Sequence, residues 1–124
     1  MKTTIKILSV ILVMAVISSC KKEGTGGKAT ITGYVKHHSA PIPNATVYIK
    51  YGAKESPGTD PSNYDANVTA DTSAKYVFKD LAKGDYYLFS IGYDSAISNT
   101  VYGGTGATIK KKTEAVQVDV PVVE

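Results

Sequence analysis

The sequence predicts an all-β protein that folds as a single Greek-key β-sandwich of about seven strands. From Ala29 onward, apolar and polar residues alternate in short runs, and no stretch has a helical period of useful length. Gly, Pro, Asn, Asp and Ser separate these runs, as they do at turns between strands. The 124 residues allow one domain after a leader segment but not two.

The seven expected strands cover residues 29–35, 45–50, 68–70, 75–79, 84–92, 97–102 and 116–122. In the first strand, alternation places Ile31 and Val35 on one face. The segment after it is expected to be a loop, because Pro41 and Pro43 lack the N–H groups that a strand ladder needs. In the second strand, apolar residues alternate with Thr, Tyr and Lys. Segment 52–67 is polar, which predicts a long loop before the short third strand.

The last four strands follow the same rule. The fourth is a short apolar and aromatic run between two lysines, and Gly84 opens the longer fifth strand. The sixth is expected to end at Gly103 and Gly104. In the seventh, four valines alternate with Gln, Asp and Pro, which is the clearest period of two in the chain.

The N-terminal segment has the layout of an export signal. Two lysines precede an apolar run at 7–17, and two serines lead into Cys20, the single cysteine. A membrane-spanning helix needs about 20 apolar residues, so this shorter run fits the apolar core of a signal peptide better. We therefore expect a signal peptide at 1–19, cleaved between Ser19 and Cys20. Small residues beside a cysteine resemble the lipobox of bacterial lipoproteins, in which the cysteine thiol is diacylated.

This resemblance implies a lipid attached to Cys20 and a protein anchored to a membrane of the cell envelope. Lys21, rather than Asp, follows the cysteine, which by analogy favours the outer membrane; periplasmic and surface exposure stay open. Residues 20–28 are expected to form the lipidated cysteine and a flexible, glycine-rich tether. Two alternatives remain: a plain secretory signal that leaves a free thiol, or a core helix, for which the chain offers no matching apolar helical face.

The composition excludes several classes of protein. All 14 basic residues are lysines, and the charge is near neutral once the leader and its two lysines are removed. Nucleic-acid binding, which requires a dense basic surface, is therefore not expected. With Cys20 acylated, no cysteine remains for a disulfide or a thiolate metal site. Stability must come from an apolar core.

Three stretches resemble the carboxypeptidase regulatory-like family, whose members are transthyretin-like sandwich domains. They are ITGYV at 31–35, PIPNATVYI at 41–49, and ADTSAKYVFKDLAKGDYYL at 70–88, in the family's order and with similar gaps. The resemblance covers 29–124 and implies a transthyretin- or immunoglobulin-like sandwich. Ala74 stands where the family usually has glycine, so this turn is expected to differ or to be mildly strained.

The sequence shows no pattern of residues that is typical of an enzyme active site. The chain has no G-x-S-x-G motif. Its two histidines, His37 and His38, are expected in an exposed loop, where neighbours on an extended chain point to opposite sides and cannot share an ion. We therefore expect no catalytic residue, no metal and no cofactor. The segment from Asp60 to Asp71 carries oxygen ligands that suit Ca²⁺, although the same residues are typical of turns, so calcium binding there stays open.

The tyrosine-rich fifth strand gives the remaining hypothesis. The register of the family places Tyr86, Leu88 and Ser90 in the core, which leaves an unusually apolar opposite face. The candidate ligand or partner face consists of Tyr48, Tyr87, Phe89, Ile91 and Tyr93. Either another segment, such as the long loop, covers this face, or it binds a partner. The predicted function is a non-catalytic, lipid-anchored envelope protein that acts as a structural, accessory or protein-interaction module. The alternative is a carbohydrate-binding surface lipoprotein.

Overall fold

The computed structural model describes residues 22–124. The predictions that concern the signal peptide, Ser19 and the lipid on Cys20 lie outside these residues. Within them, no helix is both long and apolar enough to cross a membrane. The described chain is almost entirely β-structure, which confirms the predicted fold class.

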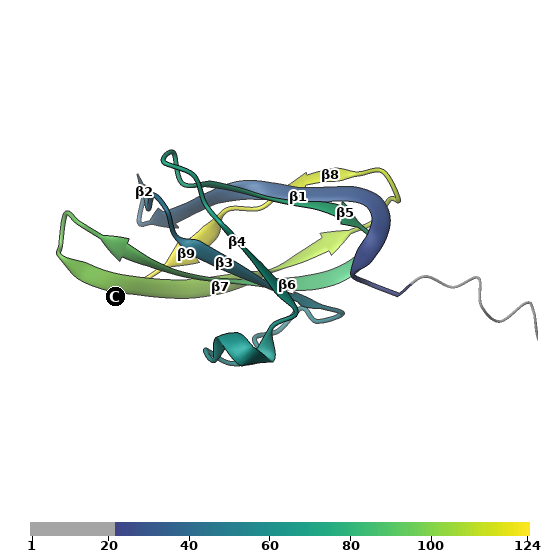
Figure 1. Cartoon of the computed structure of the whole chain (residues 1–124), viewed down its shortest axis with the longest axis horizontal. Helices are drawn as coiled ribbons and strands as arrows, with labels where there is room; N and C mark the ends of the chain where they lie inside the picture. Colours follow the sequence, from purple (N-terminus) through teal and green to yellow (C-terminus); the bar gives the residue numbers. More distant parts are fainter. Residues whose placement is uncertain (1–21) are drawn as a thin grey trace, which may run out of the picture.

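Two sheets face each other and enclose the core (Figure 1). The strands are β1 (Thr25–His37), β2 (Ala40–Pro41), β3 (Thr46–Tyr51), β4 (Ala66–Thr69), β5 (Lys75–Leu81), β6 (Gly84–Asp94), β7 (Asn99–Ile109), β8 (Ala115–Gln117) and β9 (Val120–Val122). In the first sheet, β1 is central and pairs with β2, β5, β8 and β9. The second sheet has the order β4-β3-β6-β7. A single turn of 3₁₀-helix, η2 (Pro61–Asn63), lies in the loop between β3 and β4.

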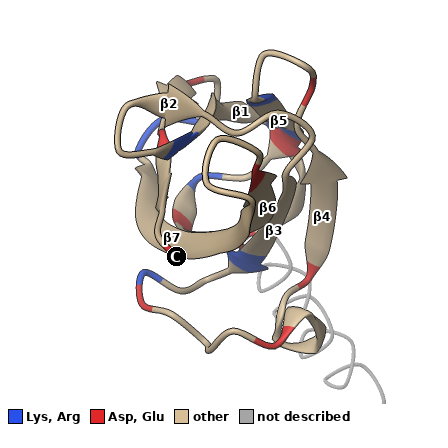
Figure 2. Cartoon of the chain, turned by 90° about the vertical axis from the view of Figure 1, so that its left-hand side faces the viewer, with Lys and Arg blue, Asp and Glu red and all other residues tan. Residues whose placement is uncertain are grey.

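Strict alternation along the strands builds the core between the sheets. In β1, every second residue from Ala29 to His37 is buried. In β6, Tyr86, Leu88 and Ser90 are fully buried, as the family register implied. The hydrophobic core also includes Val47, Ile49, Tyr76, Phe78, Leu81, Val101, Ile109, Val120 and Val122. Seen along the sandwich, lysines and acidic residues are interspersed around this core (Figure 2).

The N-terminal residues 22–28 differ from the flexible tether that the sequence suggested. β1 already begins at Thr25, where it pairs with Leu81 of β5. One residue earlier, the Gly24 N–H donates to the Tyr86 hydroxyl at 2.9 Å, and the Gly24 carbonyl accepts from Ala82 N at 2.8 Å. Glycine allows this course because Gly24 has a φ of +121°, which other residues rarely adopt. The tether prediction is wrong for these residues, since backbone hydrogen bonds order a segment without apolar side chains.

The last predicted strand is divided into β8 and β9 at Val118 and Asp119. The cause is a side chain that replaces a backbone acceptor: the Tyr34 N–H donates to Asp119 Oδ1 at 3.0 Å instead of to a strand carbonyl. The sixth predicted strand is longer than expected, because β7 continues through Gly103 and Gly104 to Ile109. The division of the last strand and the two-residue β2 account for nine observed strands where about seven were predicted.

Gly33 and Ala74 both constrain the backbone, and the strain expected at Ala74 is confirmed. A Cβ at Gly33 would lie 1.8 Å from the carbonyl oxygen of Val118, so β1 can approach the end of β8 only with glycine there. Ala74 has a φ of +68°, which costs a residue with a Cβ about 1–2 kcal/mol. The turn before β5 is therefore strained, as expected from the alanine that replaces the family's usual glycine.

Candidate functional site

An aromatic cluster covers the outer face of the four-stranded sheet. The register sets Tyr48 of β3 directly opposite Phe89 of β6, and Ile91 of β6 opposite Tyr102 of β7. The ring centroids of Tyr48 and Phe89 are 6.1 Å apart, and those of Phe89 and Tyr102 are 6.4 Å apart. These separations are typical of aromatic pairs that stabilise a face by mutual packing.

The long loop between β3 and β4 covers the centre of this cluster. Tyr64, which directly follows η2, stacks on Phe89 with a centroid distance of 5.5 Å and an interplanar angle of 17°. Phe89 is therefore only 4% exposed. Burial also raises the pKa of the Tyr64 hydroxyl, which donates to the Gly58 carbonyl at 2.8 Å. The sequence left open whether the long loop covers this face or whether the face binds a partner. At the centre of the face, the loop covers it.

Glycines in β7 let the covering groups come close. A Cβ at Gly104 would lie 2.7 Å from the ring of Tyr87, and a Cβ at Gly106 would lie 2.7 Å from the Lys54 carbonyl oxygen. The Tyr87 ring and the start of the loop therefore rest directly on the backbone of β7. This packing explains why the sequence YGGTGAT can form a strand, although three glycines in seven residues would otherwise weaken it.

One corner of the same face is uncovered. Tyr93 (56%), Tyr102 (46%) and Val123 (55%) are exposed there, and Ile97 (44%) is exposed in the adjoining turn between β6 and β7. Tyr93 and Tyr102 are diagonal neighbours on the outer face, since Tyr93 pairs with Thr100 and Ile91 with Tyr102. Val123 forms a two-way backbone bridge with Tyr102, with both N–H···O distances at 2.9 Å. We call Tyr93, Ile97, Tyr102 and Val123 the apolar corner.

The five predicted face residues thus have different surroundings. Tyr48 and Phe89 contact each other beneath Tyr64, Tyr87 lies on Gly104, Ile91 is half-buried, and Tyr93 is exposed at the apolar corner. Sequence reasoning missed Tyr64, Tyr102 and Val123. Tyr102 could have been found, because it ends the sixth predicted strand. Val123 could not, because its position depends on a bridge between strands far apart in the chain.

The acidic residues of the long loop and the following turn bind their own backbone. Asp60 Oδ1 accepts from Ser62 N at 2.9 Å and caps η2, which lowers the pKa of the Asp60 carboxyl. Asp65 Oδ2 accepts from Tyr51 N at 2.8 Å, and Asp71 Oδ1 accepts from Ser73 N at 2.8 Å. The geometry is that of turns. Within residues 22–124, these carboxylates form no group close enough to share an ion.

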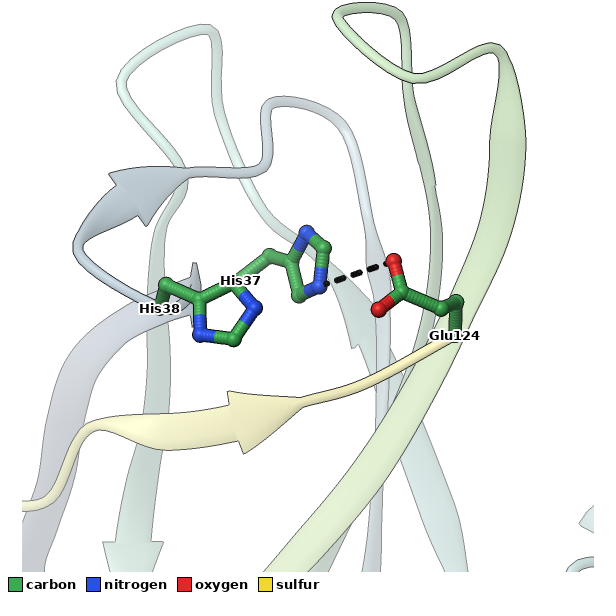
Figure 3. Close-up of side chains that lie close together, drawn as sticks. All are labelled: His37, His38 and Glu124. Carbon is green, nitrogen blue, oxygen red and sulfur yellow. Dashed lines mark ion pairs between the residues drawn. The ribbon is translucent and has the colours of Figure 1, made fainter.

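His37 is not in an exposed loop, and that prediction is wrong. β1 continues through His37, and the alternation of β1 turns its side chain inward, where it is only 5% exposed. Its Nδ1 lies 2.7 Å from Asp94 Oδ2, the last inward residue of β6. This hydrogen bond is the main cause that lowers the pKa of Asp94. His38, Glu124 and His37 gather at this end of the molecule (Figure 3).

Comparison with known proteins defines the fold but not the family. No protein-family model matches the chain, and no curated protein matches it. Among solved structures, the chain is similar to a protein from Pseudomonas aeruginosa described as a "putative carbohydrate binding protein". The TM-score is 0.51 at 18% sequence identity, and the match covers 80% of this chain and 91% of that chain. At this identity the likeness shows a shared β-sandwich, and the resemblance to the carboxypeptidase regulatory-like family stays a prediction.

Proposed function

We propose that this protein is a non-catalytic binding module of the bacterial cell envelope, anchored by a lipid on Cys20 and presenting the apolar corner to a partner. The observation that carries the proposal is the exposure of four large apolar side chains at one corner of the sheet and its adjoining turn. Soluble monomers rarely leave such residues gathered on the surface unless they bind something. The long loop covers the centre of the face, so the corner is the part left for a partner.

The corner is suited to binding because it is rigid. Tyr93 and Tyr102 lie on neighbouring strands of a continuous β6–β7 ladder, and Val123 is held to Tyr102 by two backbone hydrogen bonds. Tyrosine offers a large contact area at a low cost in conformational entropy. A partner protein would therefore meet a preformed surface with an apolar centre and polar neighbours, such as Asn99 and Thr100, which are exposed.

Carbohydrate is a second candidate ligand. Two exposed tyrosine rings on one face suit stacking against the apolar faces of sugar rings, and nearby amide and hydroxyl groups suit sugar hydroxyls. The description of the Pseudomonas protein supports this candidate, since the two chains share a fold.

Binding experiments on the full chain separate these candidates. A glycan array tests carbohydrate, and a cross-linking pull-down from envelope extracts tests protein partners. For either ligand, we expect Tyr93→Ser with Tyr102→Ser to weaken binding about tenfold or more. Tyr34→Ser, on the first sheet, is the matched control and should bind as wild type does. A double variant that binds as tightly as the control would refute the apolar corner as the binding surface.

The lipid anchor has its own test. We expect Cys20→Ala to release the protein from the membrane fraction and to abolish incorporation of labelled palmitate, while the circular dichroism spectrum of the sandwich is unchanged. A variant that stays in the membrane fraction would contradict the anchor. Protease treatment of intact cells, followed by detection of the domain, then distinguishes the periplasmic face from the cell surface.

A further inference from the structure

We propose that His37, His38 and Glu124 form a binding site for a divalent transition metal ion, with Zn²⁺ the preferred ion. The two histidines, neighbours in the sequence, come to the same side because β1 ends between them. His38 has a φ of +59°, so the extended geometry is broken and the two rings lie 4.4 Å apart, centroid to centroid. Glu124 joins them because β9 pairs in parallel with β1, with Val122 beside His37.

The distances fit a shared ion. One ligand atom from each of the three residues lies within 4.8 Å of the others. Nε2 of His37 and Oε2 of Glu124 are 3.4 Å apart (Figure 3). Two ligands at ordinary zinc distances and a tetrahedral angle are separated by about 3.3–3.4 Å. His37 and Glu124 therefore already have the required spacing, and a ring nitrogen of His38, which is exposed, lies within 4.8 Å of both ligand atoms.

An independent observation at His37 also points to a ligand. Its side chain is more than nine-tenths buried, and its Nε2 atom makes no hydrogen bond in the described structure. A buried polar nitrogen without a hydrogen bond is costly, and native structures rarely keep one without a reason. A metal ion bound at Nε2 would supply that reason.

The second nitrogen of His37 is arranged as in many metal sites. Asp94 Oδ2 lies 2.7 Å from Nδ1. A carboxylate can only accept a hydrogen bond, so this contact favours the tautomer with the proton on Nδ1 and the lone pair on Nε2. Asp94 is in turn held by the Ala96 N–H, which donates to its other oxygen at 3.0 Å. Carboxylates that orient a metal-bound histidine in this way are a common second layer around zinc.

The donor set selects the class of ion. Two imidazoles and one carboxylate suit Zn²⁺, and also Cu²⁺ and Ni²⁺, whereas Ca²⁺ needs six to eight oxygen ligands and Mg²⁺ an octahedron of oxygens. Three protein ligands leave a fourth tetrahedral position open toward solvent, since His38 and Glu124 are exposed. A water molecule or a group from a partner can fill that position.

Calorimetry with ZnCl₂ on the full chain tests the proposal. The result is easy to interpret because the chain has few other residues that bind zinc through nitrogen or sulfur. His37 and His38 are its only histidines, so the protein must carry no polyhistidine tag. The measurement is made in a Cys20→Ser background, which removes the single thiol. We expect one Zn²⁺ per chain, no heat with Ca²⁺ or Mg²⁺, and a rise in melting temperature with Zn²⁺.

Substitutions of exposed ligands avoid the problem of a variant that fails to fold. We expect His38→Ala to weaken Zn²⁺ binding at least about 100-fold and Asp94→Asn to weaken it about 10- to 100-fold. Glu55→Gln, at an exposed position in the loop between β3 and β4, is the matched control for Glu124→Gln and should bind as wild type does. No Zn²⁺ heat with wild type, or unchanged affinity in His38→Ala, would overturn the proposal and leave an ion pair between His37 and two carboxylates.

Discussion

The two ends of the sandwich close the core in different ways. At one end, which we call the Tyr86 end, the buried Tyr86 hydroxyl accepts from Gly24 N at 2.9 Å and donates to the Ala82 carbonyl at 2.5 Å. At the other, the His37 end, His37 and Asp94 meet across the two sheets, and one nitrogen of His37 has no hydrogen bond. At the first end the buried hydroxyl has both hydrogen-bond partners, whereas at the second end one buried nitrogen, Nε2 of His37, has no hydrogen bond.

The turns at the two ends differ in the same sense. Among the described residues, the left-handed positions at the Tyr86 end are mostly glycines, namely Gly24, Gly26, Gly52 and Gly84, with Asp80 the exception. At the His37 end they all carry side chains: His38, Asn44, Ala74 and Ser98. Glycine adopts this conformation without steric cost, and other residues adopt it less readily. The Tyr86 end is therefore built for stability, and the His37 end retains side chains at some cost in strain.

The largest expected effect is at the Tyr86 end. Tyr86→Phe keeps the ring but leaves the Gly24 N–H and the Ala82 carbonyl without their partner in a buried place. We expect a loss of about 2–4 kcal/mol in the free energy of unfolding, measured by urea denaturation. Tyr93→Phe, at an exposed position, should change stability by less than about 0.5 kcal/mol. If the two substitutions lowered the free energy of unfolding equally, the buried hydrogen bonds of Tyr86 would not be what stabilises this end.

The second prediction concerns the His37 end and depends on the proposed metal site. At a free Zn²⁺ concentration of 100 times Kd, binding should raise the free energy of unfolding by about 2.7 kcal/mol. His38→Ala should remove this gain while leaving the stability of the metal-free protein within about 0.5 kcal/mol of wild type. Thermal denaturation with and without Zn²⁺ gives both values. A gain of the same size in His38→Ala would place the ion elsewhere.

Alkaline pH should act on the Tyr86 end. Burial is the main cause that raises the pKa of Tyr86 above its ordinary value of 10.0. The folded protein therefore keeps this proton when the unfolded chain has lost it. Its contribution to stability is complete below pH 10 and declines as the pH rises further, by up to about 1.4 kcal/mol per pH unit.

Urea denaturation between pH 9 and pH 11 measures this slope. Tyr86→Phe should make the slope of the free energy of unfolding against pH shallower than in wild type. Part of the slope that remains should come from Tyr76, whose pKa burial also raises. A slope that is the same in wild type and Tyr86→Phe would show that this hydroxyl does not link folding to alkaline pH.

The smallest effect is expected at the turn before β5, at the His37 end. Ala74→Gly relieves the strain of a φ of +68°, but it also adds conformational freedom to the unfolded chain. The two terms oppose each other, so we expect a stabilisation of less than about 1 kcal/mol. A destabilisation of more than that in chemical denaturation would mean that the Ala74 methyl group, which is fully buried, matters more than the strain.

Most of the fold could be predicted from the sequence because the strands alternate strictly. The inward faces of β1 and β6 follow from a period of two, and Ala74 marks a real constraint on the backbone. The loop expected from Pro41 is wrong in part, because Ala40 and Pro41 form the short edge strand β2. The errors came from contacts between distant segments. The N-terminal residues 22–28 are held in place partly by the hydrogen bond between Gly24 and Tyr86. The division between β8 and β9 depends on the hydrogen bond from the Tyr34 N–H to Asp119.

The candidate sites were less predictable for the same reason. The aromatic face was found from alternation in β6, but its cover, Tyr64, belongs to a loop with no period. The prediction for the histidine pair is wrong because an extended backbone would point the two rings to opposite sides, whereas the positive φ of His38 brings both to one side. Glu124 and Asp94 reach His37 only through strand pairing and packing between sheets, which no local pattern encodes.

The early start of β1 has a consequence for where the module stands if Cys20 carries a lipid. Gly24 is already fixed to the Tyr86 end, and the four residues from the cysteine to Gly24 span at most about 14 Å. The Tyr86 end must then rest close to the bilayer. Thr25 and Ala29 both pair with Leu81, so the regular part of β1 runs from Ala29 to His37 and spans about 26 Å. The His37 end and the apolar corner would therefore stand about that much farther from the lipid headgroups than the Tyr86 end. This short connection would orient the molecule, with the Tyr86 end toward the membrane and the exposed side chains of the His37 end and the apolar corner toward a partner.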